Sequence, residues 1–146
     1  MSCVDTYYVV KGRVIDGIGE GAKYVKLYHH VLKNILGASP YPGTLNILLD
    51  SSEVQKLKDL LQKHSCKYFI PPPCESCAHA YAWKAYLKVY ERCFTVYIVK
   101  PAKTVHSDNI VELLSEVYLR KTFSLKTGDE VEICITLDCE KPCNCS

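Results

Sequence analysis

Three short segments of the sequence carry residue types that can bind a phosphorylated ligand. The first runs from Gly17 to Gly21, where glycines alternate with Ile18 and Glu20. Glycine readily adopts positive φ, so successive backbone N–H groups of this run can point into one concavity and hold phosphate oxygens. The run lacks the Gly-Lys-Ser/Thr ending of a P-loop and the strand-to-helix setting of a dinucleotide fingerprint. Taken alone, it is better explained as a glycine-rich hairpin turn.

The second segment, 40–46, contains two residues that can bind a metal ion. Thr44 and Asn46 lie two residues apart on an expected strand, so their side chains share one face. A threonine hydroxyl and an asparagine carbonyl are hard oxygen ligands, which suit Mg²⁺ that also binds water and substrate phosphates. A polar pair facing solvent explains the same spacing, and the spacing alone favours that explanation.

The third segment, 103–129, contains scattered polar residues. Thr104 can donate to a polar ligand atom, Glu112 can accept from a ligand hydroxyl or ring N–H, and Arg120 can pair with phosphate or help to fix a base. Each of these residues is common by itself. Glu112 is equally explained as a solvated helix residue, and His106 as a helix cap or a hydrogen-bonded structural histidine.

The sequence holds nine cysteines, which is many for 146 residues. Cys74 and Cys77 form a Cys-x-x-Cys pair, and the end of the chain adds Cys139, Cys143 and Cys145. Cys74 and Cys77 can hold a structural Zn²⁺ together with the tail cysteines, or they can form disulfides in a cytosol that tolerates them, as in hyperthermophilic archaea. A third interpretation, small core hydrophobes, is the one that we favour for Cys66, Cys93 and Cys134.

The elements that must position these segments are short strands and helices. Period-two alternation and β-branched or aromatic residues predict strands over 7–15, 24–27, 44–49, 80–89, 94–99 and 130–136. Helical patterns predict helices over 28–36, from a Ser52–Gln55 capping box to about His64, over 107–114 and over 119–123. The stretch 71–77 is expected to be an irregular insertion.

Length and composition favour one globular domain. We place that domain at 1–138 and a cysteine-bearing tail at 139–146. Because strands outnumber helices and several connections are short, a closed sheet with helices outside it is favoured over a doubly wound sheet. Lysine and arginine exceed aspartate and glutamate by only 18 to 16, so we expect no nucleic-acid and no membrane partner. No apolar run approaches the roughly 20 residues of a membrane span, and we expect a cytoplasmic protein.

Together, in this order and spacing, the three segments resemble the archaeal CTP-dependent riboflavin kinases. The resemblance is strongest over 17–24, 36–50 and 99–135. It implies a mainly β fold with peripheral helices, a six-stranded cradle-loop (riboflavin-kinase-like) β-barrel. The implied activity is Mg²⁺-dependent transfer of a phosphoryl group from CTP to the ribityl 5′-hydroxyl of riboflavin, which gives FMN and CDP. Riboflavin/FMN and CTP/CDP are the implied partners, and we expect a monomer.

The resemblance also implies roles for individual residues. Nucleotide-binding residues form two runs: Ile18, Gly19, Glu20, Gly21, Ala22 and Lys23 at the phosphates, and Val117, Tyr118, Leu119 and Arg120 at the cytidine end. Thr44 and Asn46 are implied to hold Mg²⁺, and Thr104 and Glu112 to contact the flavin. No catalytic residue is assigned. A barrel that binds flavin or nucleotide without catalysis is the alternative, while the near-neutral charge disfavours a DNA-binding regulator.

Overall fold

The computed structural model describes residues 7–17, 20–102 and 107–138. Seven strands and four helices form within these residues. The strands are β1 (Tyr8–Ile15), β2 (Leu45–Leu49), β3 (Lys67–Ile70), β4 (Ala80–Val89), β5 (Arg92–Pro101), β6 (Ile110–Leu114) and β7 (Glu130–Ile135). The helices are α1 (Glu20–Leu27), α2 (His29–Leu36), α3 (Ser51–Lys63) and α4 (Leu119–Thr122).

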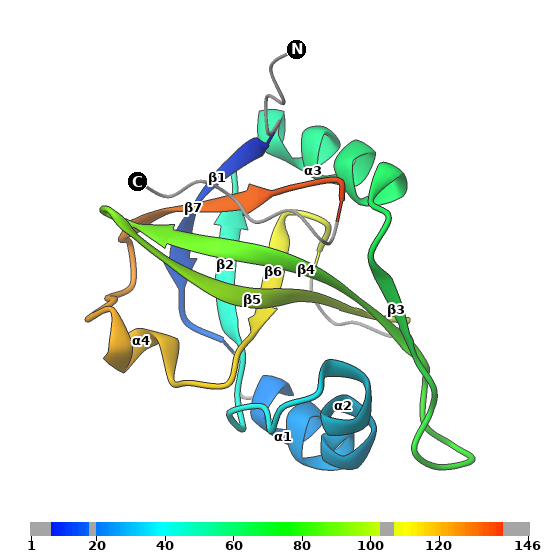
Figure 1. The fold of residues 1–146 in the computed structure, drawn as a ribbon. Helices are drawn as coiled ribbons and strands as arrows, with labels where there is room; N and C mark the ends of the chain where they lie inside the picture. The colour runs from blue at the N-terminus through cyan, green and yellow to red at the C-terminus, as the bar shows by residue number, and fades with distance from the viewer. Residues whose placement is uncertain (1–6, 18–19, 103–106, 139–146) are drawn as a thin grey trace.

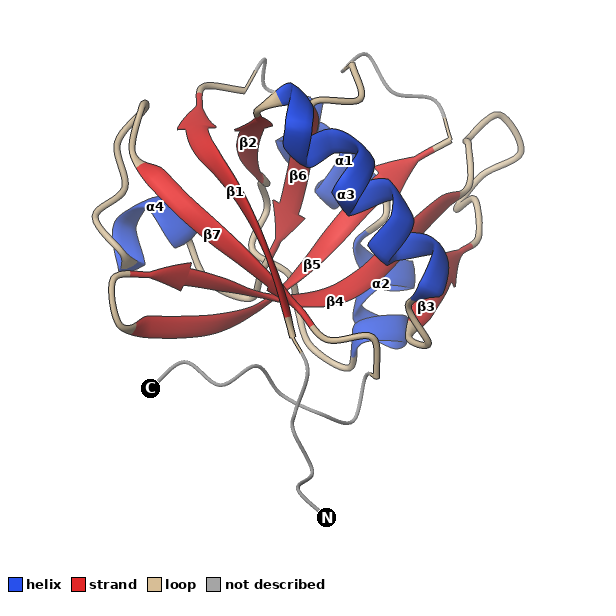
Figure 2. Cartoon of the chain, turned by 90° about the horizontal axis from the view of Figure 1, so that it is seen from above, coloured by secondary structure: helices blue, strands red, loops and turns tan. Residues whose placement is uncertain are grey.

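The strands form one antiparallel sheet that closes on itself. Their order is β3-β4-β5-β6-β2-β1-β7, and an additional pairing joins β4 to β7. Six strands therefore make a closed ring, while β3 is attached to β4 outside it (Figure 1). The mainly β fold with peripheral helices, predicted from the sequence, is confirmed. Figure 1 shows α3 at the top of the ring and α1 and α2 together at the bottom, and in the view from above α4 lies on the left, apart from these three helices (Figure 2).

Two hydrophobic clusters hold the helices to the sheet. The larger cluster fills the ring, where Val10, Ile47 and Leu113 are buried together with Leu57 of α3 and Leu119 of α4. The smaller cluster lies on the outer face of β4, β5 and β6 and is covered by α1 and α2; its members include Val25, Leu32, Ala82, Val99 and Leu114. Strands β4, β5 and β6 are thus apolar on both faces, and α1 is held against the outside of the sheet.

The helix predicted over 107–114 is wrong, because this stretch contains strand β6. Val111 and Leu113 point into the ring, whereas Leu114 packs in the outer cluster. A strand that is buried on both faces reads as a continuous apolar run, and such a run also satisfies a helical pattern. The correction places Glu112 on a strand next to β2 rather than on a solvated helix.

The strand predicted over 24–27 is also wrong, because these residues belong to α1. Val25 is fully buried and Tyr28 nearly so, a spacing of three residues that suits one helix face. Aromatic and β-branched residues after the glycines imitate a strand at this point. The chain therefore passes from strand β1 through the glycine run into helix α1. This is the strand-to-helix setting that the sequence analysis did not predict.

The other predicted elements are confirmed, with ends shifted by at most two residues. These are β1, α2, β2, α3, β4, β5, α4 and β7. The capping box before α3 is wrong, because Asp50 is the N-cap residue and makes no side-chain cap hydrogen bond. The short strand β3 was not predicted. In the described part of the chain, no helix combines the length and apolar character needed to cross a membrane.

The cysteines divide into three groups. Cys74 and Cys77 are joined by a disulfide, which favours the disulfide interpretation over Zn²⁺ for this pair. Cys66 is buried and free, as expected of a small core residue. Cys93 and Cys134 are disulfide-bonded, so the prediction that they are small core hydrophobes is wrong. The tail cysteines, Cys139, Cys143 and Cys145, lie outside the described residues.

Candidate active site

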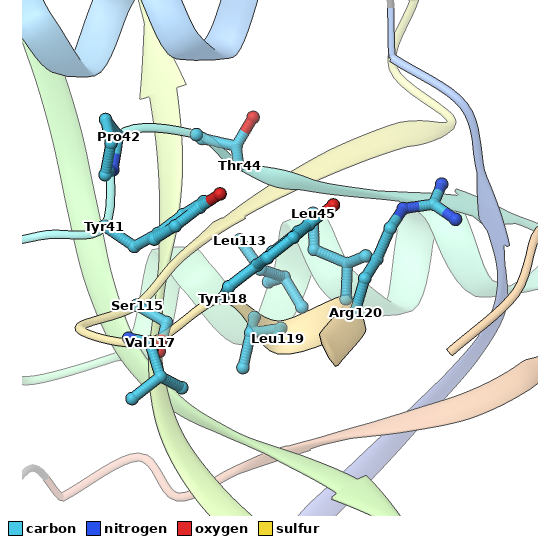
Figure 3. A pocket seen from close by; sticks show the side chains of 11 residues that line it. Tyr41, Pro42, Thr44, Leu45, Leu113, Ser115, Val117, Tyr118, Leu119 and Arg120 are labelled. Carbon is cyan, nitrogen blue, oxygen red and sulfur yellow. The ribbon is translucent and has the colours of Figure 1, made fainter. Parts of the chain in front are cut away.

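A pocket of about 220 Å³ opens where β2 and the chain after β6 meet. Its lining residues are Tyr41, Pro42, Gly43, Thr44, Leu45, Leu113, Ser115, Val117, Tyr118, Leu119 and Arg120 (Figure 3). The pocket brings Thr44 of the expected metal pair together with all four residues of the run 117–120. We refer to it as the tyrosine pocket.

Two parallel tyrosine rings form one wall of the tyrosine pocket. Tyr41 and Tyr118 stack with ring centroids 4.7 Å apart and an interplanar angle of 4° (Figure 3). The Tyr41 backbone N–H donates to the Ser115 carbonyl at 2.7 Å, and the Val117 N–H donates to the Ser115 hydroxyl at 3.2 Å. These bonds fix both ring-bearing segments. A rigid, partly exposed aromatic face is a surface on which nucleobases stack. Tyr41 was missed by the sequence reasoning, although an aromatic residue between two prolines is a signal of a rigidly held ring.

The first turn of α1 touches Thr44. A Cβ atom at Gly21 would lie 2.1 Å from the Thr44 Oγ1, so only glycine allows the helix to approach β2 so closely. The first N–H groups of a helix have no acceptor within it, and the helix dipole favours anions at this end. Backbone N–H donors are therefore available beside Thr44. They belong to the first turn of helix α1 and not to a hairpin turn, because Gly21 is helical. Ile18 and Gly19 lie outside the described residues.

Three oxygen-bearing side chains meet on the outer face of β2 and β6. The Thr44 hydroxyl donates to the Glu112 Oε1 at 3.1 Å. Asn46 lies directly opposite Glu112 in the β2–β6 register. Its side chain is only 7% exposed, and within the described residues its Oδ1 accepts no hydrogen bond. The solvent-facing alternative for Thr44 and Asn46 is therefore wrong, since Asn46 is buried and Thr44 is half-buried.

The oxygen atoms of this cluster fit a hard divalent cation. A buried carbonyl oxygen without a donor is costly and needs a partner, and the Asn46 Oδ1 is such an atom. Magnesium accepts neutral oxygen ligands and takes further ligands from water and substrate phosphates. No group of three histidine, cysteine or acidic side chains arranged for a metal ion exists among the described residues.

A second pocket, of about 230 Å³, adjoins the same cluster from the other side. It is lined by Val99, Lys100, Pro101, Ser107, Asp108, Ile110 and Glu112, and we refer to it as the Glu112 pocket. Burial lowers the pKa of Lys100, an effect that the Asp108 carboxylate opposes. Thr44 lines the tyrosine pocket and its acceptor Glu112 lines this one, so a single hydrogen bond links the two pockets. Thr104 lies outside the described residues.

Arg120 faces the end of β1. Its guanidinium donates to the Ile15 carbonyl at 2.9 Å and to the Asp16 Oδ1 at 3.2 Å. The Thr127 hydroxyl donates to the same Asp16 oxygen at 2.6 Å. In Figure 3 the guanidinium points away from the tyrosine rings. Arg120 thus lines the tyrosine pocket with its stem and tethers the chain just before the glycine run.

Comparisons with known proteins agree with this arrangement. Residues 14–135 match the family model for CTP-dependent riboflavin kinases, which carries the description "Domain of unknown function DUF120". A riboflavin kinase from Staphylothermus marinus is 40% identical over 126 residues, which cover 86% of this chain and 90% of that protein. Riboflavin kinases from Ignicoccus hospitalis and Aeropyrum pernix are 37% and 33% identical, covering 86% and 84% of this chain and 70% and 92% of their own lengths.

The matched range runs from β1 to the end of β7 and includes both pockets and the Thr44–Asn46–Glu112 cluster. The chain therefore belongs to the archaeal CTP-dependent riboflavin kinase family and is a kinase that phosphorylates riboflavin to FMN.

Proposed function

We propose that this kinase uses CTP as its phosphoryl donor and Mg²⁺ as its cofactor, and that it releases CDP with FMN. One observation carries the proposal: the Thr44–Glu112 hydrogen bond joins the tyrosine pocket, whose stacked rings suit a nucleobase, to the Glu112 pocket, which is the proposed flavin site. Donor and acceptor bound in these two pockets would meet at the oxygen cluster, which is where a transferred phosphoryl group needs charge stabilisation.

The tyrosine pocket is the proposed nucleotide site. The pyrimidine base would stack on the exposed face of the Tyr41–Tyr118 pair, and backbone groups of 117–120 are available to read its edge. From there the phosphates would extend past Thr44 to the start of α1, where Gly21 leaves room for close approach. Preference for cytidine is supported by the family name.

Thr44 and Asn46 are the proposed protein ligands of Mg²⁺. Because the Thr44 hydroxyl gives its proton to Glu112, the lone pairs of Oγ1 remain available for a cation. The Asn46 Oδ1 supplies a second neutral oxygen. When bound, Mg²⁺ would neutralise charge on the triphosphate. The Glu112 carboxylate would thus fix the rotamer of Thr44 while it lines the flavin pocket.

The reaction that this arrangement supports is an in-line displacement. The ribityl 5′-oxygen forms a bond to the γ-phosphorus of CTP, the bond from that phosphorus to the β–γ bridging oxygen breaks, and the hydroxyl proton passes to solvent water. CDP leaves with the bridging oxygen. Such transfers pass through a loose transition state, so positioning matters more than a strong base, and Glu112 is assigned to binding.

The direct test is to incubate the purified protein with riboflavin, Mg²⁺ and either CTP or ATP, and to separate the flavins by chromatography. FMN formed with CTP and not with ATP is the expected result. FMN formed equally well with ATP would refute the nucleotide assignment. Binding of both ligands without any FMN would point to the non-catalytic alternative.

The metal assignment has its own test. Thr44→Val combined with Asn46→Ala should abolish most activity at limiting Mg²⁺, with partial recovery as Mg²⁺ is raised. Thr95→Val is the matched control, because this strand hydroxyl lines neither pocket. Full activity of the double variant at limiting Mg²⁺ would show that the proposed ligands are wrong.

A further inference from the structure

Tyr24 of α1 packs against the outer face of the sheet. It lies one helical turn after Gly21, the residue that contacts Thr44, so both residues belong to the face of α1 that packs on the sheet. The ring is partly buried against the outer hydrophobic cluster. The hydroxyl oxygen itself is buried, and within the described residues it has no hydrogen-bond partner.

The surroundings of the Tyr24 hydroxyl favour its protonated form. Burial raises the pKa of Tyr24, and the neighbouring Tyr28 and the charge of Glu112 raise it further. Tyr24 packs against the outer cluster, and Val99, a member of that cluster, lines the Glu112 pocket. At neutral pH the group is a hydrogen-bond donor whose proton no described residue accepts.

The adjacent tyrosine behaves differently. Tyr28 stacks on Tyr24, with ring centroids 4.2 Å apart and an interplanar angle of 20°. Its hydroxyl donates to the Ala78 carbonyl and so ties α2 to the loop before β4. A buried hydroxyl without a partner costs free energy, and phenylalanine would fill the same space without that cost. Packing therefore explains the Tyr24 ring and leaves its hydroxyl unexplained.

We propose that the Tyr24 hydroxyl binds substrate, donating a hydrogen bond to an oxygen of the ribityl chain of riboflavin. This inference rests on the proposed function, because it assumes that the flavin occupies the Glu112 pocket. Tyr24 then acts with Glu112, which accepts from the ligand while Tyr24 donates to it. The pair recognises a polyhydroxyl chain, in which every hydroxyl can both donate and accept.

The test compares Tyr24→Phe with Tyr28→Phe. We expect Tyr24→Phe to weaken riboflavin binding, measured by quenching of flavin fluorescence, by about tenfold, which is the usual effect of one lost hydrogen bond. Its KM for CTP and its affinity for lumichrome, a flavin ring system without the ribityl chain, should stay unchanged. Its melting temperature should equal or exceed that of the wild type. Tyr28→Phe should melt at a lower temperature and bind riboflavin normally.

The outcomes separate the two proposals. If wild type binds no riboflavin and forms no FMN with CTP, the proposed function fails. If wild type is active and Tyr24→Phe binds riboflavin as tightly, only the Tyr24 inference fails. The inference would also be overturned if Tyr24→Phe lost as much affinity for lumichrome as for riboflavin, or if only its KM for CTP changed. In either case the contact of the Tyr24 hydroxyl would not be to the ribityl chain.

Discussion

The contact between α1 and β2 predicts that Gly21→Ala, a change of one methyl group, will inactivate the enzyme while leaving it folded. The new Cβ would lie 2.1 Å from the Thr44 Oγ1, where real Cβ atoms approach no closer than 3.0 Å. Rotation of the Thr44 side chain cannot relieve the contact fully, because the Thr44 Cβ and backbone N each lie 3.2 Å from the same point. If Thr44 keeps the rotamer that bonds Glu112, the helix and the strand must separate by about 0.9 Å, from 2.1 Å to the 3.0 Å limit; if Thr44 rotates instead, its hydrogen bond to Glu112 is lost.

The size of the effect follows from two opposing terms. Overpacking of this kind costs about 1–3 kcal/mol, while alanine in place of glycine favours the helix by up to about 1 kcal/mol. We expect a net loss of about 1–2 kcal/mol in the free energy of unfolding, which a folded domain tolerates. Displacement of a catalytic group by about 1 Å costs about 100-fold in rate. The kcat/KM for FMN formation should thus fall about 100-fold.

Urea denaturation and steady-state kinetics measure the two quantities, and a double-mutant cycle identifies the cause. In a Thr44→Ala background the Oγ1 atom is absent, so Gly21→Ala should cost less than half as much stability as it does in wild type. An equal cost in both backgrounds would mean that the contact with Oγ1 is not responsible. Unchanged kinetics in the single variant would refute the close approach of α1 to Thr44.

Three further predictions concern stability. Cys74→Ser opens the short disulfide loop and should lower the free energy of unfolding by about 2 kcal/mol; in urea titrations, added reductant should abolish the difference between wild type and variant, because Cys93 and Cys134 are reduced in both proteins. Burial lowers the pKa of His64, an effect that its hydrogen bond with the Lys84 carbonyl opposes, and its Nδ1 accepts from the Cys66 N–H. Near pH 6.5 the His64 side chain binds a proton in the unfolded chain but not in the folded protein. The free energy of unfolding should therefore be constant above that pH and decline as the pH falls toward the lower pKa of His64 in the folded protein. His64→Gln should remove this decline, which urea titrations at several pH values would measure. Arg120→Met should destabilise by about 1 kcal/mol through loss of the bond to the Ile15 carbonyl, because the exposed Asp16 pair adds little; a thermal shift larger than several degrees would contradict this.

Local patterns in the sequence predicted local structure well. The alternation of β7 and the spacing of Thr44 and Asn46 on one strand face both depend on residues close in the chain, and the structure agrees with each. Helix α3 was predicted by its apolar period, although its cap was not. The failures at β6 and α1 have different causes. Strand β6 is buried on both faces, which hides the period that distinguishes strand from helix. Helix α1 is buried on one face, and its aromatic and β-branched residues imitate a strand.

Relations between distant segments were beyond such patterns. The hydrogen bond from Thr44 to Glu112 requires β2 to lie beside β6 in a particular register, and nothing near either residue specifies that pairing. The stacking of Tyr41 on Tyr118 likewise depends on the path of the chain after β6. The resemblance supplied candidate functional residues without the contacts among them. It also gave no reason to single out Tyr24, whose importance emerges only from its buried and unpaired hydroxyl.

Ring closure constrains how the protein can be made on the ribosome. Tyr8 pairs with Ile135 and Tyr86 with Cys134, so one late segment completes both β1 and β4. Until 130–135 have left the exit tunnel, the nascent chain carries two strands with unsatisfied edges, and such edges recruit other chains. A chain that ends before Glu130 would form an open sheet with unpaired edges and would aggregate, instead of forming a slightly shortened enzyme. The need for chaperones should therefore last until 130–135 have left the exit tunnel.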